Sequence, residues 1–200
     1  MLGVKGDCRG CASFDFVVLC KQDVEEPLKV VRHVLERLGL SLNETKTHRV
    51  DAKQASFNFL GFTIQMSQGA RTGKPYPNVR PADKSLKKIK ARLTELTARN
   101  LTAIPLEDVV GRMNRSLRGW ANYFHYRNSS QIMGKARQHA EDRLRTHLLK
   151  RYKVKNRKAA LIRFPRRDLY EQYGLYKVPT VAGWNSAHPS VSRASESRVR

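Results

Sequence analysis

The stretch PLEDVVGRMNRSLRGWANYFHY, from Pro105 to Tyr126, is the most informative part of the sequence for the fold. Its apolar residues recur at steps of three and four, the spacing of one face of an α-helix, and arginines are interleaved off that face. The sequence therefore predicts a helix that buries one side and presents a basic side to solvent. The apolar stripe is Val109, Met113, Leu117, Trp120 and Phe124, and the interleaved cations are Arg112, Arg115 and Arg118.

Two more helices are predicted on either side of this stretch. One precedes it, with a stripe of Leu86, Ile89, Leu93 and Leu96 and with Lys87, Lys88, Lys90 and Arg92 mostly off the stripe. The other follows over residues 130–152, on Ile132, Met133, Ala136, Ala140, Leu144 and Leu148.

The front of the chain reads as mixed strand and helix. Residues 13–20 (SFDFVVLC) have the length and composition of a buried strand. A helix should open near Asp23 and stop near Gly39, with Val24, Leu28, Val31, Leu35 and Leu38 as its stripe. Residues 40–50 read as a strand or loop with a turn at 43–46, and 57–66 as a bulged strand or tight hairpin beside Gly61.

Four segments are predicted, and the fold class is α+β. Residues 1–66 form the strand-containing unit, 67–83 form a linker because they hold two Gly and three Pro, 84–165 form the helical unit, and 166–200 form a basic tail. The last twenty residues read as frayed.

Charge separates these segments. The chain has a net charge of +22, of which residues 1–65 carry +1 (nine basic, eight acidic) and residues 66–200 carry +21 (thirty basic, nine acidic). Such a charge favours an anionic partner, usually nucleic acid. The sequence also lacks the roughly 18 consecutive apolar residues of a membrane span and any secretory leader. Its three cysteines, all before residue 21, suit a reducing compartment.

Five motifs in this order resemble a known family. FVVLCK, LGLSLNETKT, FNFLGF, a basic helix and RSLRGWANYF follow one another as in the last part of a group II intron-encoded reverse transcriptase/maturase, and FPRRDLYEQYGLYKVPT is similar to the segment after them. The resemblance covers residues from about 12 to 190 and implies the end of a palm, a thumb and a maturase domain. It also implies a bacterial cytoplasmic protein.

The resemblance includes a departure at the catalytic box. The family has Tyr-Ala-Asp-Asp directly before Phe-Val-Val-Leu, whereas this chain reads Ala12-Ser13-Phe14-Asp15. Asp15 stands at the second aspartate, as a degenerate catalytic remnant, and Phe14 stands where the first, metal-binding aspartate belongs. Because two-metal nucleotide addition needs carboxylates from separate strands, we expect no polymerase activity from this chain alone. No cofactor is expected, and Mg²⁺ would enter only if a separate palm completed the site.

The resemblance implies an RNA-binding, maturase-like function. Group II intron RNA is the expected partner, the basic tail leaves DNA open as another, and no membrane is expected. Two alternatives remain: the C-terminal part of a split reverse transcriptase, and a non-functional truncated copy. The candidate RNA-binding residues are Lys87, Lys88, Lys90, Arg92, Arg112, Arg115, Arg118, Tyr123 and Arg127.

Several conspicuous residues have structural interpretations instead. Trp120 and Phe124 lie on the apolar stripe and are expected in the core, whereas Tyr123 lies off it and is the better surface candidate. Cys8 and Cys11 have the spacing of a zinc pair, but no second pair follows, so no metal site is expected. For the same reason, the zinc-dependent DNA endonuclease that many family members carry is expected to be absent.

Overall fold

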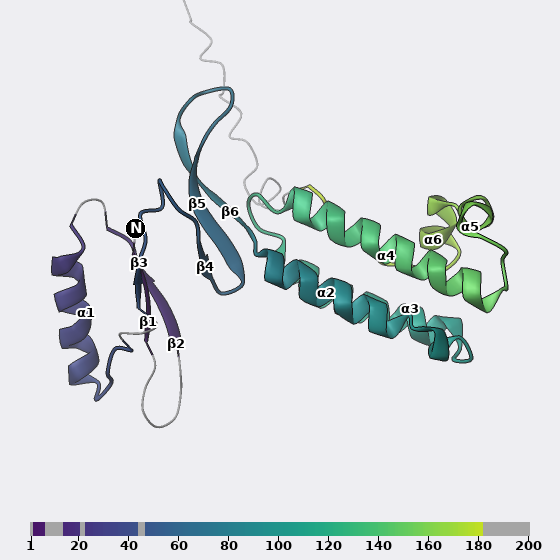
Figure 1. Ribbon diagram of the computed structural model, residues 1–200, viewed down its shortest axis with the longest axis horizontal. Helices are drawn as coiled ribbons and strands as arrows, with labels where there is room; N and C mark the ends of the chain where they lie inside the picture. Colours follow the sequence, from purple (N-terminus) through teal and green to yellow (C-terminus); the bar gives the residue numbers. More distant parts are fainter. Residues whose placement is uncertain (1, 7–13, 21–22, 44–46, 182–200) are drawn as a thin grey trace, which may run out of the picture.

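The computed structural model describes residues 2–6, 14–20, 23–43 and 47–181. Strands and one helix lie at one end of the molecule, and a bundle of helices extends from them, so the α+β class is confirmed (Figure 1). The strands form two separate three-stranded antiparallel sheets, which we call sheet A and sheet B.

Sheet A has the strand order β2-β1-β3. It consists of β1 (Leu2–Gly6), β2 (Phe14–Val18) and β3 (His48–Arg49). The strand expected over residues 13–20 is therefore present as β2, but it lies at a sheet edge instead of in a buried core, and Leu19 directly after it is 61% exposed. Strand β1 was not predicted, because it is only five residues long and two of them are glycines, which are depleted in strands.

Helix α1 (Glu25–Arg37) begins and ends where the sequence predicted. The carboxylate of Asp23 accepts hydrogen bonds from the N–H groups of the next two residues, at 2.6 and 3.1 Å. Gly39 ends the helix with φ +68°, a conformation that glycine adopts without strain. Leu28 and Leu35 of the predicted stripe are buried, whereas Leu38 is 65% exposed, which corrects its assignment to the core.

Sheet B confirms the hairpin that was one of the two interpretations of residues 57–66. Strand β4 (Phe57–Phe59) pairs with β5 (Phe62–Gln68) across a two-residue turn in which Leu60 and Gly61 have φ of +46° and +80°. A Cβ atom on Gly61 would lie 3.1 Å from the ring of Phe124, a tight contact that would make the ring shift, so the close approach of the turn to the bundle also favours glycine.

Residues 67–83 differ from the expected linker. Strand β6 (Pro75–Pro81) lies within this segment and pairs with β5 over its whole length. Its three prolines stand at positions 75, 77 and 81, so their nitrogens all face the same edge. Because β6 is an outer strand of sheet B, that edge is the one away from β5, where the missing N–H groups break no ladder hydrogen bonds. The division into domains stays a prediction.

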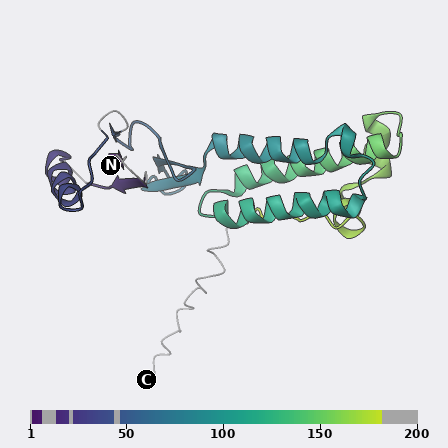
Figure 2. The same ribbon diagram turned by 90° about the horizontal axis from the view of Figure 1, so that it is seen from below.

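The three predicted helices of the rear unit are confirmed as α2 (Asp83–Leu96), α3 (Leu106–Phe124) and α4 (Ser130–Arg151). They lie side by side as a bundle, with the short 3-10 turn η1 (Arg99–Leu101) between α2 and α3 (Figure 2). All the predicted stripe residues of α2 and α4 are buried. On α3, Trp120 and Phe124 are half-buried and pack against the same core.

Two short helices, α5 (Arg157–Arg163) and α6 (Arg166–Glu171), follow the bundle. The described part of the expected basic tail packs on the bundle and does not extend from it. Its apolar residues Leu169, Leu175 and Val178 are at most 4% exposed and join the bundle core. The expectation of frayed residues falls mostly on 182–200, outside the described residues.

Candidate nucleic-acid interface

The basic cluster of α2 lies on the side of that helix away from the core. Lys87, Lys88 and Arg92 are exposed, and Lys90 is half-buried. Arg92 pairs with Glu95 at 3.2 Å, and both of these side chains are solvated, so the pair is weak. Three cations of this cluster are thus presented to solvent within two turns of one helix.

The arginine series of α3 is exposed along the same helix that supplies much of the core. Arg112, Arg115 and Arg118 are exposed, and none of them forms an ion pair with another described residue. The guanidinium of Arg118 lies over the ring of Tyr176, 5.3 Å from its centroid. Such stacking holds the group in place while its N–H donors still face solvent.

Tyr123 and Arg127 lie where α3 meets sheet B. Tyr123 is 55% exposed, and its hydroxyl donates a hydrogen bond to the carbonyl of Leu60 at 3.1 Å. Its ring contacts Phe62 and Phe124, with centroids 5.9 and 4.7 Å away. The side chain therefore ties sheet B to the bundle and also leaves ring surface open.

Sheet B contributes two hollows that the sequence did not reveal. One face of the sheet carries Asn58, Thr63 and Arg80 in register, and together with Lys84 and Lys88 of α2 it borders a polar groove of about 660 Å³. Arg80 was missed because it stood in the expected linker, and its place opposite Thr63 depends on the pairing of β6 with β5, which the sequence does not reveal.

The opposite face of sheet B is apolar. Phe62, Ile64 and Val79 line a hollow of about 380 Å³ together with Tyr123 and Tyr126 of the α3 end. The guanidinium of Arg127 lies over the ring of Tyr126, with its central carbon 5.5 Å from the ring centroid. The two hollows share the exposed Leu60 of the turn as a rim, so the hairpin separates a basic surface from an aromatic one.

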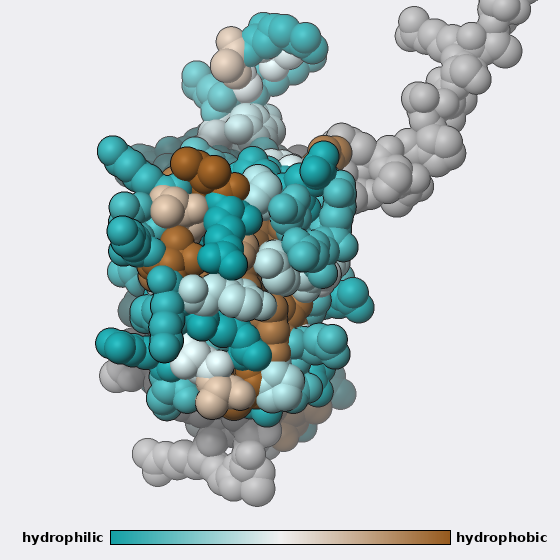
Figure 3. All heavy atoms as spheres, turned by 90° about the vertical axis from the view of Figure 1, so that its right-hand side faces the viewer, coloured by the Kyte–Doolittle hydropathy of each residue, from teal (hydrophilic) through white to brown (hydrophobic). Residues whose placement is uncertain are grey.

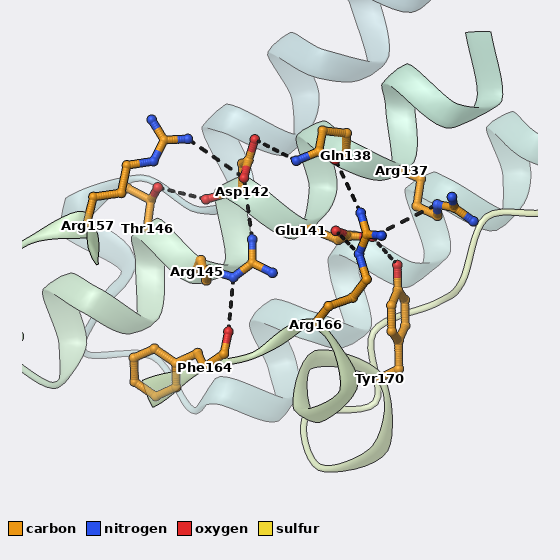
Figure 4. A network of polar contacts seen from close by, with 10 residues as sticks. All are labelled: Arg137, Gln138, Glu141, Asp142, Arg145, Thr146, Arg157, Phe164, Arg166 and Tyr170. Atoms are coloured by element: carbon orange, nitrogen blue, oxygen red, sulfur yellow. Dashed lines mark hydrogen bonds and ion pairs between the residues drawn. The ribbon is translucent and has the colours of Figure 1, made fainter. Parts of the chain in front are cut away.

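Other cations of the bundle are used internally. Glu141 of α4 is 1% exposed and accepts hydrogen bonds from the guanidinium of Arg166 at 2.7 Å and from the hydroxyl of Tyr170 at 2.6 Å (Figure 4). Burial and this hydrogen bond raise the pKa of Tyr170 well above its usual range. Arg145 likewise donates to the carbonyl of Phe164 at 3.0 Å. These contacts fasten α5 and α6 to α4 and are structural.

The two histidines of α4 are structural as well. His139 approaches the carbonyl of Lys90 at 3.1 Å, and His147 is fully buried. Burial lowers the pKa of both imidazoles. Both side chains lie between α4 and α2 rather than on the basic surface.

The remaining sequence candidates are only partly placed. Asp15 lies on β2, where the backbone register sets it opposite Lys5. Cys8 and Cys11 lie outside the described residues. Within the described ranges, no three histidine, cysteine, aspartate or glutamate side chains gather as metal ligands would. Among the same residues, no helix has the length and apolarity needed to cross a membrane.

Comparison with known proteins finds a family model that matches most of the bundle. Residues 86–164 match the family model described as group II intron, maturase-specific domain. A search of curated proteins found no match to the chain. The matched segment begins inside α2 and ends directly after α5, so it includes the basic surfaces of α2 and α3. Residues 86–164 are therefore similar to a group II intron maturase-specific domain, which is consistent with the resemblance of the chain to the C-terminal part of a group II intron-encoded reverse transcriptase.

Proposed function

We propose that the helical unit binds group II intron RNA and helps that RNA to fold for splicing. The observation that carries this proposal is the exposed arginine series Arg112, Arg115 and Arg118, which lies unpaired on α3 within a maturase-specific domain. Phosphate contacts from such side chains fix the register and orientation of a nucleic acid. The net charge of +21 over residues 66–200 supplies the long-range attraction.

Structural selectivity would come from the parts of the surface that are not simply charged. Single-stranded loops and bulges of RNA present bases that stack on aromatic side chains. Tyr123 and Tyr126 border the aromatic hollow beside the cation of Arg127, so phosphate and base contacts can both be made at this end of α3. We infer that this combination favours structured RNA over a uniform duplex.

Filter binding of the full chain to intron RNA at several salt concentrations tests the proposal. With about 6–10 phosphates contacted, affinity should fall ~10³–10⁵-fold between about 50 and 200 mM salt, by the slope known for duplex DNA. Replacing the three arginines of the α3 series by glutamine should weaken binding and lower the salt slope by about one unit for each phosphate that is no longer neutralised. Binding that is insensitive to salt, or a triple variant with unchanged affinity and slope, would contradict the proposal.

A second candidate function is the C-terminal component of a split reverse transcriptase. One observation favours it: Val30 and Val34 of α1 and Leu38 directly after it lie at steps of four and are 61%, 47% and 65% exposed. An apolar helical stripe of this kind suits a protein partner, such as a separately encoded palm. Primer extension with Mg²⁺ should stay at background for this chain alone, and extension that Asp15→Ala abolishes would contradict that expectation.

A further inference from the structure

The far end of the bundle, away from the sheets, carries the densest positive charge of the chain. Residues 150–167 include nine Lys/Arg and no Asp/Glu. They form the last turn of α4, the loop after it, α5 and the start of α6. In Figure 1 this end lies farthest from sheet A, and Figure 3 faces it directly.

Four of these nine cations have a hydrogen-bond acceptor or a carboxylate partner within the protein. Arg151 donates to the carbonyls of Thr102 and Ile104 at 2.8 and 2.6 Å. The other three are paired with carboxylates: Arg157 with Asp142 at 3.8 Å, Arg166 with Glu141 at 2.7 Å, and Arg167 with Glu171 at 3.5 Å.

The other five cations are exposed and form no ion pair with any described residue. They are Lys150, Lys153, Lys155, Lys158 and Arg163. We call these five residues the distal surface. Five like charges within fourteen positions repel one another in water, so the arrangement costs free energy unless an anionic ligand screens it.

The distal surface also contains features that a purely solvating face does not need. The guanidinium of Arg163 lies 5.6 Å from the centroid of the Tyr152 ring. Tyr152 itself is 44% exposed. Beside it, Leu161 and Ile162 of α5 are 48% and 83% exposed. Figure 3 shows hydrophobic surface interspersed among hydrophilic side chains at this end of the molecule. Cations next to an aromatic ring and apolar side chains suit a ligand that alternates phosphates with ribose and bases.

We propose that the distal surface is a second RNA-contact surface, separate from the cluster at Lys87 and Lys88. Those two lysines lie near the start of α2, next to sheet B, whereas the distal surface lies at the other end of the bundle. Helix α4, whose 22 residues span about 33 Å, separates the two ends. The inference rests on the proposed RNA-binding function and deepens it: one chain would hold two segments of a folded RNA at once.

The test uses the full chain and compares two triple variants that remove the same charge. The distal variant is Lys153→Gln/Lys155→Gln/Lys158→Gln, and the control is Lys53→Gln/Arg71→Gln/Lys74→Gln, whose three side chains are also exposed but lie near sheet B. All six positions are solvated, so thermal unfolding should be the same for both variants and for the parent chain.

Affinity for intron RNA and its salt slope are the first readouts. The distal variant should bind at least ~10-fold more weakly than the control, and its salt slope should be lower by about two to three units, since each neutralised phosphate contributes about one unit to the slope. The second readout is stoichiometry with a short RNA stem-loop: the parent and control chains should bind two copies, and the distal variant one.

Equal affinity and stoichiometry for the two variants would overturn the inference and leave the proposed function intact, because the parent chain would still bind RNA. A parent chain that does not bind intron RNA at all would overturn both. The same two variants are also mixed with phosphatidylserine-containing vesicles. If the distal variant loses vesicle binding while its RNA affinity equals that of the control, the surface binds membranes and the inference is wrong.

Discussion

The front unit and the helical unit differ in how completely each buries its own apolar surface. From Leu86 to Val178, twenty buried residues form one continuous core. Before Lys74, by contrast, only Leu28, Leu35, Ala52 and Phe57 are buried apolar residues among those whose side-chain exposure the structure describes, from Phe16 onward. The helical unit therefore has the core of an independent domain, whereas the front unit has the exposed strand edges and helix surface of an incomplete one.

Charge follows the same division. Residues 66–200, which contain the well-packed unit, carry nearly all of the net charge, +21, whereas residues 1–65 carry +1. Self-repulsion destabilises a compact basic unit, so a substantial core is what allows it to stay folded before it meets an anionic partner. Charge and stability therefore reside together in the part of the chain that matches the maturase-specific domain.

The largest expected effect is the difference between the two units when they are separated. A polypeptide of residues 82–181 should unfold in one cooperative transition, because it contains the whole continuous core. A polypeptide of residues 1–81 should show no such transition and should tend to associate through its exposed edges and apolar surface. Circular dichroism during thermal unfolding checks both, and a cooperative transition in the 1–81 polypeptide would remove the distinction between the units.

Within the intact chain, a substitution in the helical core should lower the free energy of unfolding by several kcal/mol more than a substitution at the exposed apolar surface of the front unit. Leu117 is fully buried in α3, so Leu117→Ala should lower the free energy of unfolding by ~2–5 kcal/mol. Leu38→Ala removes the same atoms from a side chain 65% exposed and should change that free energy by less than ~0.5 kcal/mol. Urea denaturation followed by circular dichroism measures both, and comparable losses would show that the front unit has a core of similar quality.

The adjacent residues Arg166 and Arg167 provide a test, with a smaller expected effect, of the contacts that hold α6 against α4. Arg166→Gln removes a hydrogen-bonding cation from Glu141, which is 1% exposed, and should cost ~1–3 kcal/mol because the carboxylate stays buried. Arg167→Gln alters only solvated pairs with Asp168 and Glu171 and should cost less than ~0.5 kcal/mol. Chemical denaturation at neutral pH measures the difference, and equal values would remove the internal role assigned to Arg166.

The smallest expected effect is a pH dependence that belongs to the bundle. Burial lowers the pKa of His147 below its ordinary value of 6.5, so the unfolded chain takes up a proton in a pH range where the folded chain does not. The unfolded state then binds more protons, and stability falls as the pH decreases from about 6.5 through the lowered folded pKa. His139 contributes in the same direction.

Denaturation at pH 7 and at about pH 5.5 should therefore show lower stability at the acid value, and His147→Leu should make the decrease smaller. If the substitution leaves the difference between the two pH values unchanged, His147 is not a source of this dependence.

Helical periodicity allowed the three long helices to be predicted one by one, because the stripes of α2, α3 and α4 repeat over several turns. The pairing and register of strands could not be predicted in the same way from the sequence. The segment over residues 67–83 looked like a linker, since prolines at 75, 77 and 81 usually exclude a strand. Only the position of β6 at the outer edge of sheet B makes them compatible with one, and that position depends on tertiary pairing.

The candidate site was predictable where it lay on helices. Arg112, Arg115 and Arg118 are exposed as predicted, since their offset from the apolar stripe decides exposure. Arg80 and Lys84 were not identified, because their groove forms only when sheet B meets α2. The internal role of Arg166 was also hidden: its partner Glu141 lies twenty-five residues earlier, and sequence spacing does not reveal such a contact.

The maturase-like function is best tested by the relative affinity of the full chain for group II intron RNA and for a length-matched RNA of scrambled sequence. Both are measured by filter binding at one fixed salt concentration, so that the electrostatic contribution is the same for each. We expect tighter binding to the intron RNA, because its folded loops present bases and phosphates together to the surface of the helical unit. Equal affinity for the two RNAs would mean that only non-specific electrostatics acts, and it would contradict the maturase-like function.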